Sequence, residues 1–200
     1  MMPRGYFANG WILVDGKKMS KSEGNFYTLK QLNEDFGADA SRIGLATAGD
    51  NLDDANLAME EVNQGILKLS ALEMWLKDNL CKLDSLRTES PQEDNIAFYD
   101  SVFENQLKKM VFEANESYDA LVMRKVVADV FFGMQKLRED YCLNCGTHGM
   151  KKDLVVRYVE LQLLLLYPLA PHFTEIKWKE LFLPSIGDAA KDYPELISYA

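Results

Sequence analysis

The sequence predicts a mainly α-helical protein, an antiparallel helical bundle preceded by a short stretch of strand and loop. From Tyr27 onward, glycine and proline become sparse and apolar residues recur at helical spacing. Before Tyr27, Asn9-Gly10 and Asp15-Gly16 bracket a short apolar run, which is typical of a hairpin or strand. With 48% hydrophobic residues over 200 positions, the chain has enough apolar material for a packed core.

The elements after the hairpin follow from the spacing of apolar residues. Segments 28–36 and 38–49 are expected to be helical. A long helix is expected from Leu52, with Asp53 and Asp54 in its first turn, where the helix dipole favours acids. Its apolar stripe consists of Leu52, Ala55, Met59, Val62, Ile66, Leu69 and Leu72. This stripe predicts one buried face.

Further helices follow an irregular segment. Residues 81–94 combine serine, proline and charge without periodicity, which indicates an exposed connection. A fourth helix is expected over 151–167, and a fifth is expected to start after Pro171 and end before Pro184. The second stripe is Ile96, Tyr99, Phe103, Leu107, Met110 and Ala114, and the third is Ala120, Met123, Val127, Val130, Met134, Leu137 and Tyr141.

Charge and cysteine content restrict the class of protein. A net charge of −9 argues against the broad basic face of a stand-alone nucleic-acid binder, so a polyanion would have to meet local positive patches. The three cysteines give no disulfide framework and suit a reducing compartment. The first residues lack the apolar core of a secretion signal, and the most apolar run, 161–170, is too short to span a membrane. We therefore expect a cytoplasmic protein without membrane contact.

The segment 15–25, DGKKMSKSEGN, gathers three lysines and two serines in an otherwise acidic chain. Lysine ammonium groups, with hydroxyls and free amides beside them, are suited to phosphate oxygens. Glycines near both ends of the segment would let it close over a bound nucleotide and open again. A loop rich in lysine, serine and glycine is, however, more often a solvated turn, so both interpretations stay open on these grounds.

The order of residues in this loop, KMSKS followed by EGN, resembles the signature loop of class I aminoacyl-tRNA synthetases. The resemblance implies that the loop closes on ATP, with its Mg²⁺, during amino-acid activation. It implies an ATP-binding set of Lys18, Met19, Ser20, Lys21 and Ser22, with Lys21 as the principal catalytic contact and Lys18 as its support. A cation whose contact forms mainly in the transition state lowers the barrier of the reaction.

Two further segments extend the resemblance over essentially the whole chain. Residues 37–56 resemble the segment that joins the signature loop to the helical anticodon-binding domain, and 167–175 resemble a recurrent turn late in that domain. The sequences ANG before the loop and AGDNLDDAN after it are most similar to leucyl-tRNA synthetases of the archaeal and eukaryotic cytosolic type. Isoleucyl, valyl and methionyl enzymes share the loop and remain alternatives, as does a non-catalytic RNA- or protein-binding module.

The resemblance also implies a division of the chain and a set of partners. Residues 1–36 would end a Rossmann-type catalytic domain, 37–187 would form the bundle, and 188–200 a tail or linker. The two histidines lie outside any H-x-G-H sequence, so this chain alone is not expected to activate leucine. The full enzyme would use tRNA(Leu), leucine and ATP, and further protein partners or a multi-synthetase complex remain open.

Three other groups of residues are candidates for binding. Lys151, Lys152 and Arg157 are the candidate tRNA contacts, as phosphate-positioning cations, with a solvated helix face as the alternative. The sequence CLNCGTH at 142–148 is a partial zinc pattern without a fourth ligand, so no protein-bound metal is predicted. The aromatic residues Trp75, Trp178, Phe131 and Phe132 are expected in the core rather than stacked on bases.

Overall fold

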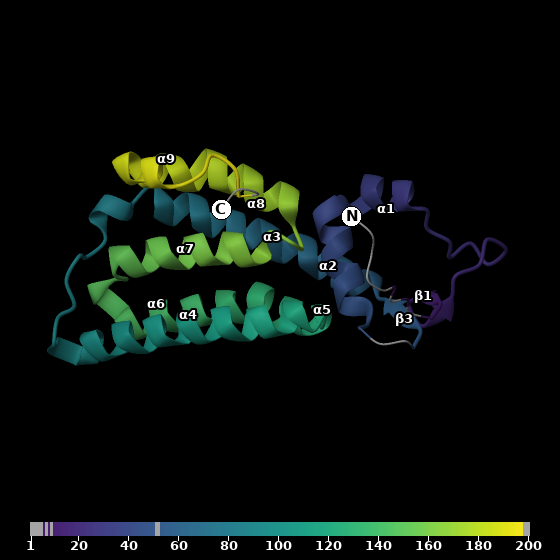
Figure 1. The fold of residues 1–200 in the computed structure, drawn as a ribbon, viewed down its shortest axis with the longest axis horizontal. Coiled ribbons are helices and arrows are strands. Elements are labelled where there is room, and N and C mark those ends of the chain that lie inside the picture. Colours follow the sequence, from purple (N-terminus) through teal and green to yellow (C-terminus); the bar gives the residue numbers. More distant parts are fainter. Residues whose placement is uncertain (1–5, 7, 9, 51–52, 198–200) are drawn as a thin grey trace.

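The structure, a computed structural model, describes residues 6, 8, 10–50 and 53–197. The strands are β1 (Ile12–Val14), β2 (Lys17–Lys18) and β3 (Ala55–Leu57). The α-helices are α1 (Leu29–Phe36), α2 (Ala38–Ala48), α3 (Met59–Leu80), α4 (Ile96–Asp119), α5 (Met123–Val126), α6 (Met134–Cys145), α7 (Lys152–Leu166), α8 (Pro171–Lys177) and α9 (Leu183–Ser185), and a π-helical segment, Val127–Gly133, joins α5 to α6. Figure 1 shows an elongated molecule in which a helical bundle, α3–α9, is joined at one end to a strip containing the strands, α1 and α2.

The strip contains a three-stranded sheet of order β2-β1-β3. β1 pairs antiparallel with β2 and parallel with β3, so α1 and α2 form the connection between the parallel strands. Thr28 caps α1, because its hydroxyl accepts the N–H of Gln31 while the Gln31 side chain accepts the N–H of Thr28. The predicted hairpin and both short helices are thereby confirmed.

The predicted start of the long helix was wrong. Residues Ala55–Leu57 form a strand, and α3 begins only at Met59; Leu52, the predicted first position, lies outside the described residues. Asp53 and Asp54 consequently precede a strand and do not occupy a first helical turn. The physical reason is that β1, more than 40 residues earlier in the sequence, has a free edge. The backbone of Ala55–Leu57 forms hydrogen bonds with this edge.

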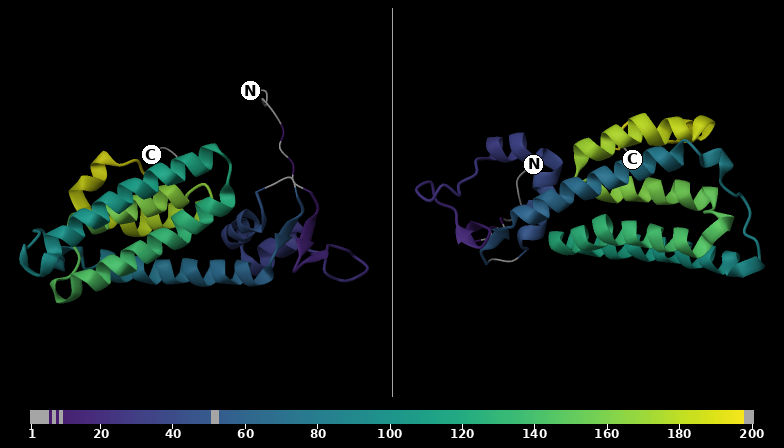
Figure 2. Two further views of the ribbon diagram at one scale, coloured as in Figure 1. Left: turned by 90° about the horizontal axis from the view of Figure 1, so that it is seen from below. Right: turned by 180° about the vertical axis from the view of Figure 1, so that it is seen from behind.

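α2 and α3 pack closely because a glycine lies at their contact. A Cβ built on Gly44 of α2 would come within 2.4 Å of Cγ2 of Val62, a fully buried residue of α3. Both views in Figure 2 show α3 running from the strip along the bundle. Its 22 residues span roughly 33 Å at the usual helical rise. One continuous helix therefore belongs to both parts of the molecule.

The bundle consists of antiparallel helices around a shared apolar core. Most of the predicted stripe positions are buried or partly buried, but Ile66 and Ala120 are exposed. Ala120 lies where the chain leaves the helix, since α4 ends at Asp119 and Leu121 has a positive φ of 57°. None of the helices in the described parts of the chain carries an apolar stretch long enough to cross a membrane. The largest fully buried side chains are Trp178, Tyr158, Phe131, Phe182, Ile43, Leu57, Leu72, Leu76, Ile96, Leu107, Met134 and Leu163.

The last helix continues past the residue at which it was expected to stop. A π-helical segment, Trp178–Phe182, follows α8, and α9 then includes Pro184 in its first turn. An N–H at that position would have no partner within its own helical segment, so a proline there costs no hydrogen bond of α9. The proline therefore marks a change in helix type and does not end the helical run.

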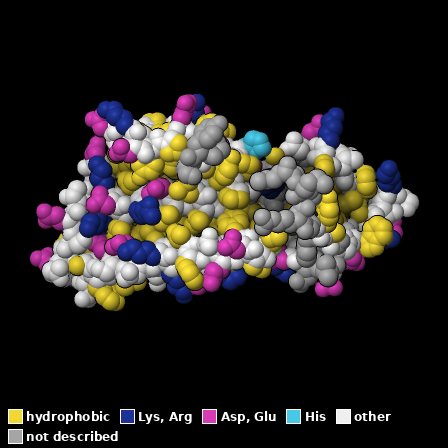
Figure 3. Space-filling view, viewed as in Figure 1, with side chains coloured by type: hydrophobic (Ala, Val, Ile, Leu, Met, Phe, Trp, Pro, Cys, Tyr) yellow, Lys and Arg dark blue, Asp and Glu magenta, His cyan; other side chains and the backbone are white. Residues whose placement is uncertain are grey.

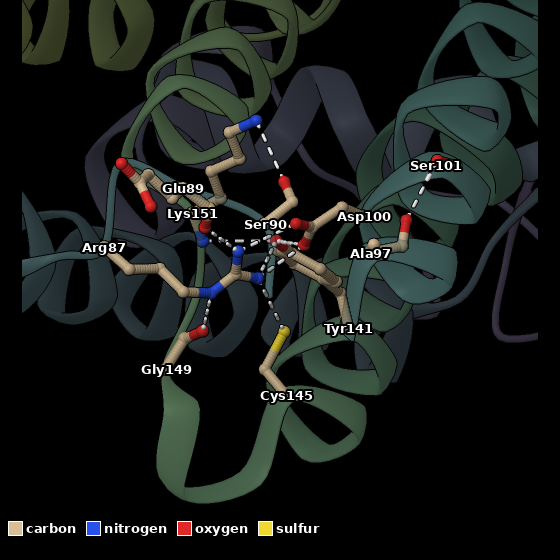
Figure 4. Close-up of polar contacts among 10 residues, drawn as sticks. All are labelled: Arg87, Glu89, Ser90, Ala97, Asp100, Ser101, Tyr141, Cys145, Gly149 and Lys151. Atoms are coloured by element: carbon tan, nitrogen blue, oxygen red, sulfur yellow. Dashed lines mark hydrogen bonds and ion pairs between the residues drawn. The ribbon is translucent and has the colours of Figure 1, made fainter. Parts of the chain in front are cut away.

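The connection 81–94 is only partly exposed, which corrects the prediction. Leu83 is 3% exposed and belongs to the core. Arg87 enters a network of polar contacts with Asp100, Tyr141, Cys145 and Gly149 (Figure 4). The segment lacks helical periodicity because it is held by these individual side chains.

Two acids of the strip cap helices of the bundle at their junction. Oδ2 of Asp39, on α2, accepts the backbone N–H of Phe173 in the first turn of α8 at 2.6 Å. Both carboxylate oxygens of Asp50, just after α2, accept the N–H of Arg124 in the first turn of α5 at 3.0 Å. Carboxylates at helix N-termini satisfy unpaired amides and oppose the positive end of the helix dipole.

A cation of α2 makes the opposite contact. Arg42 donates from Nε to the carbonyl of Leu169 at 2.9 Å and from Nη2 to the carbonyl of Pro168 at 2.6 Å, just beyond the end of α7. A positive group there matches the negative end of the α7 dipole. The junction of strip and bundle is therefore built from charged side chains at helix ends as well as from apolar packing.

Candidate active-site loop

The signature loop begins at a tight hairpin turn. Asp15 and Gly16 connect β1 to β2, with positive φ angles of 48° and 76°. Two consecutive positive φ angles are typical of a type I′ turn, which Asp-Gly sequences favour because glycine adopts this region freely. The turn leads into Lys17 and Lys18 on β2, and Lys18 is the first residue of the KMSKS sequence.

Asn25 closes the loop that follows. Its Oδ1 accepts the N–H of Ser20 at 2.8 Å, and its Nδ2 donates to the carbonyl of Lys18 at 3.1 Å. The hydroxyls of Ser20 and Ser22 lie 2.8 Å apart, and Gly24 takes a positive φ of 73° where the chain reverses. The asparagine of the EGN sequence thus fixes the two ends of the KMS segment to each other.

The two lysines of the loop lie over aromatic rings. Nζ of Lys18 is 4.5 Å from the centroid of the Trp11 ring, and Nζ of Lys21 is 5.1 Å from that of Phe26. Both lysines are exposed, and among the described ion pairs neither has a carboxylate partner. A cation–π contact at an exposed site is worth about 0.5–1 kcal/mol, so the two lysines would leave these rings at little cost to contact a triphosphate.

An apolar pocket of about 420 Å³ lies beside the loop. Lys18 and Met19 line it together with Trp11, Phe26 and Leu32. The predicted ATP-binding residues divide into three groups, of which Lys21 over the Phe26 ring is one. Lys18 and Met19 face this pocket, whereas Ser20 and Ser22 direct their hydroxyls toward each other. Such a pocket with a cation at its edge is suited to a ligand that has an apolar part and an anionic part.

The candidate tRNA contacts lie far from the signature loop. Lys152 is the first residue of α7, and Arg42 contacts the chain just beyond the last residue of this helix, at the junction with the strip. The 15 residues of α7 span roughly 22 Å between these two ends. Nζ of Lys151 donates to Ser90 Oγ at 3.1 Å. The other two cations pair with acids, Lys152 with Asp84 and Arg157 with Glu160, each at 2.7 Å. Figure 3 shows positive and negative side chains interspersed at the end of the bundle away from the strip.

The partial zinc pattern has a different role in the structure. Cys142 is exposed, whereas Cys145 is buried and lies 3.7 Å from Nη2 of Arg87. Burial raises the pKa of the Cys145 thiol, and the hydrogen bond from Arg87 opposes this shift. The described residues contain no cluster of three metal-ligating side chains. Trp178 and Phe131 are fully buried, as predicted for core aromatics.

Two family descriptions match the chain. Residues 100–198 match "Anticodon-binding domain of tRNA ligase", and residues 1–69 match "tRNA synthetases class I (M)". The chain belongs to the class I aminoacyl-tRNA synthetases. Its relatives include the cytoplasmic leucine-tRNA ligases of Arabidopsis thaliana, 38% identical over 90% of this chain, and of Saccharomyces cerevisiae, 39% identical over 90%. The chain spans only 16% of the length of either relative.

A solved structure agrees on the fold. The LeuRS-tRNA-LeuAMS ternary complex of Agrobacterium radiobacter K84 agnB2 superimposes with a TM-score of 0.68 over 96% of this chain and 24% of its own, at 20% identity. This match confirms the predicted mainly α-helical class. The relatives confirm the predicted resemblance to leucyl-tRNA synthetases, and their names carry the cytoplasmic type that was expected.

Sequence reasoning missed the residues that support this synthetase loop. Trp11 donates its backbone N–H to Oδ1 of Asp54 at 2.7 Å, and Gly16 donates to Oδ1 of Asn56 at 2.7 Å. The signal in the sequence was the repeated Asp and Asn in GDNLDDAN, since these side chains often accept backbone N–H groups. Their partners lie about 40 residues earlier, so the sequence alone could not identify them.

Proposed function

We propose that this chain forms the signature-loop strip and the tRNA-binding helical bundle of a leucine-tRNA ligase. The enzyme would join leucine to tRNA(Leu) through leucyl-adenylate, with ATP and its Mg²⁺ as substrates. The observation that carries the proposal is the KMSKS loop, whose two lysines are exposed and lack described carboxylate partners. The strip that contains this loop is joined to a bundle that matches an anticodon-binding domain.

The chemistry assigned to the loop follows from where charge develops. When the leucine carboxylate attacks the α-phosphorus of ATP, the bond to the departing pyrophosphate breaks and negative charge grows on its oxygens. Lys21, with Lys18 in support, would leave its aromatic ring and contact these oxygens. A cation that gains its contact mainly in the transition state raises kcat. Met19 would flank the nucleotide from the pocket wall, and the Ser20 and Ser22 hydroxyls would add neutral donors.

The opposite end of the bundle would contact the tRNA backbone through Lys151, Lys152 and Arg157. Lys151 has only the Ser90 hydroxyl as its described side-chain partner, so it would exchange that partner for a phosphate most readily. Lys152 and Arg157 would have to release Asp84 and Glu160 first. Each phosphate contact removed by alanine should reduce the magnitude of the salt slope of tRNA binding by roughly one.

Leucine is favoured over the other amino acids by the relatives, which are named leucine-tRNA ligases across plants and fungi. The description that matches residues 1–69 carries the letter M, so methionine belongs in any test beside isoleucine and valine. The experiment is ATP–pyrophosphate exchange by the native full-length polypeptide with each of the four amino acids. Leucine alone should support exchange. Exchange with another of the four would reassign the substrate, and none at all would favour a non-catalytic binding module.

A further inference from the structure

We propose that Asp15 and Asn56 are positioning residues of the signature loop, which fix its first turn against the N-terminal end of α3. The effect on reaction rate rests on the proposed function, whereas the effect on loop order does not. Neither residue belongs to the KMSKS sequence or is among the predicted ATP contacts. Both act through the backbone of the turn that precedes Lys17 and Lys18.

Asp15 serves as the cap of a helix that lies 44 positions later in the chain. Its Oδ1 accepts the backbone N–H of Met59, the first residue of α3, at 3.0 Å. The residue at the N-cap position of α3, Ala58, has no side-chain acceptor of its own. The N–H of Asp15 in turn donates to the carbonyl of Leu57 at 3.2 Å. Asp15 therefore supplies the cap that the local sequence lacks.

Asn56 holds the other residue of the same turn. Its Oδ1 accepts the N–H of Gly16 at 2.7 Å. Asn56 lies on β3, where it is paired with Leu13 of β1 in a parallel register. Three hydrogen bonds therefore join the turn to the start of α3 and the strand before it. Asp15 takes part in two of them, through its side chain and its backbone N–H, and Gly16 takes part in the third. A turn held in this way has little freedom to pivot.

The position of this turn determines where the loop lysines begin. β2 has only two residues, and its register pairs Lys18 with Leu13, so a shift of the turn moves Lys18 with it. The other end of the connection is rigid, because α3 buries Leu72 and Leu76 completely in the bundle core. The loop is therefore positioned relative to the bundle as well as to the strip. Small displacements of a charged group from its reacting partner are costly in rate.

The experiment uses two variants at each position in the native full-length polypeptide. Asp15→Gly removes the cap while keeping a residue that adopts a positive φ freely, and Asp15→Asn retains an oxygen acceptor. Asn56→Ala removes its acceptor, and Asn56→Asp retains one. Asp35→Asn, at an exposed position on α1, is the matched control for the loss of one negative charge.

Hydrogen exchange, measured by mass spectrometry without substrates, tests the positioning directly. Asp15→Gly and Asn56→Ala should speed exchange in residues 15–25 several-fold, while residues 62–80 of α3 and the rest of the bundle keep wild-type rates. Asp15→Asn and Asn56→Asp should restore most of the protection. Faster exchange throughout α3 would overturn the proposal in favour of a general folding role, and unchanged exchange in 15–25 would overturn it outright.

Leucine-dependent pyrophosphate exchange provides the second measurement. Asp15→Gly and Asn56→Ala should lower kcat roughly tenfold with an unchanged KM for leucine, and the acceptor-retaining variants should recover most of this loss. A wild-type kcat in both truncated variants would contradict the positioning role. If the wild-type polypeptide shows no exchange with any amino acid, the proposed function fails, whereas the hydrogen-exchange result still decides whether the loop is held by these residues.

Discussion

Arg87 donates two hydrogen bonds to the carboxylate of Asp100, at 2.7 and 2.5 Å, and the two side chains are only 12 and 7% exposed. Arg87 also donates to the carbonyl of Gly149 at 2.7 Å, and Tyr141 donates its hydroxyl to Asp100 at 2.6 Å. One arginine in the connection between α3 and α4 therefore holds α4, α6 and the segment before α7 together (Figure 4).

Breaking this pair should destabilise the bundle strongly. Arg87→Met leaves the Asp100 carboxylate buried without its cation, and removal of one partner of a buried pair typically costs about 3–5 kcal/mol. Chemical denaturation should show a loss near the lower figure, because both groups retain some exposure. Lys82→Met, at an exposed position of the same connection, should change the free energy of unfolding by less than about 0.5 kcal/mol. Equal losses in the two variants would contradict this role of Arg87.

The same pair predicts a dependence of stability on pH. Burial raises the pKa of Asp100, but hydrogen bonds from Arg87, Tyr141 and Ser90 outweigh it, so the pKa lies below its ordinary value. A lowered folded-state pKa gives stability that is present above the unfolded value of about 4 and is lost as the pH falls through the folded value. The difference in unfolding free energy between wild type and Asp100→Asn should therefore shrink below about pH 4. A constant difference from pH 7 to pH 2 would argue against the shift.

At the junction, Asp39 should contribute through its cap of α8. Its side chain is 11% exposed and accepts the Phe173 N–H, with Nδ1 of His172 also 3.1 Å from Oδ1. Asp39→Ala should lower the free energy of unfolding by about 1–2 kcal/mol, whereas Asp39→Asn, which keeps an acceptor, should cost less. Thermal or chemical unfolding measures both variants. If Asp39→Asn cost as much as Asp39→Ala, charge and not the cap would be the main contribution.

Two helical glycines at the contact of α2 and α3 should respond oppositely to alanine. At Gly44 the added Cβ would meet Val62 Cγ2 at 2.4 Å, so Gly44→Ala should destabilise by about 1–3 kcal/mol. At Gly65 the nearest atom, Ile43 Cγ2, lies at an ordinary 3.6 Å, so Gly65→Ala should be neutral or stabilise by up to about 1 kcal/mol through helix propensity. Unfolding curves of the two variants provide the comparison, and equal effects would show that the helices adjust to the added methyl group.

Local signals in the sequence were sufficient for the elements whose contacts are local. The Asp15-Gly16 turn predicted its structure, and the spacing of apolar residues predicted α4 and the part of α3 that follows Met59. The strand Ala55–Leu57 was missed because Ala55 also fits a helical stripe, and only the distant edge of β1 selects the strand. For the same reason, the burial of Arg87 could not be read from a segment rich in serine, proline and charge.

The candidate site shows the same division. The KMSKS residues were identified from their order alone, and the structure adds the aromatic rings beneath the two lysines. The supports at Asp15, Asp54 and Asn56 depend on pairing between segments about 40 residues apart. Their acceptor side chains are visible in the sequence, but their donors are fixed only when the sheet forms.

The most direct test of the account is the effect of Lys21→Ala on leucine-dependent ATP–pyrophosphate exchange in the native full-length polypeptide. Lys30→Ala, which removes a cation 82% exposed on α1, is the matched control. Because Lys21 is proposed to contact the departing pyrophosphate mainly in the transition state, kcat should fall about a hundredfold with little change in the KM for leucine, and Lys30→Ala should keep wild-type rates. Wild-type exchange by Lys21→Ala would contradict the catalytic role of the loop.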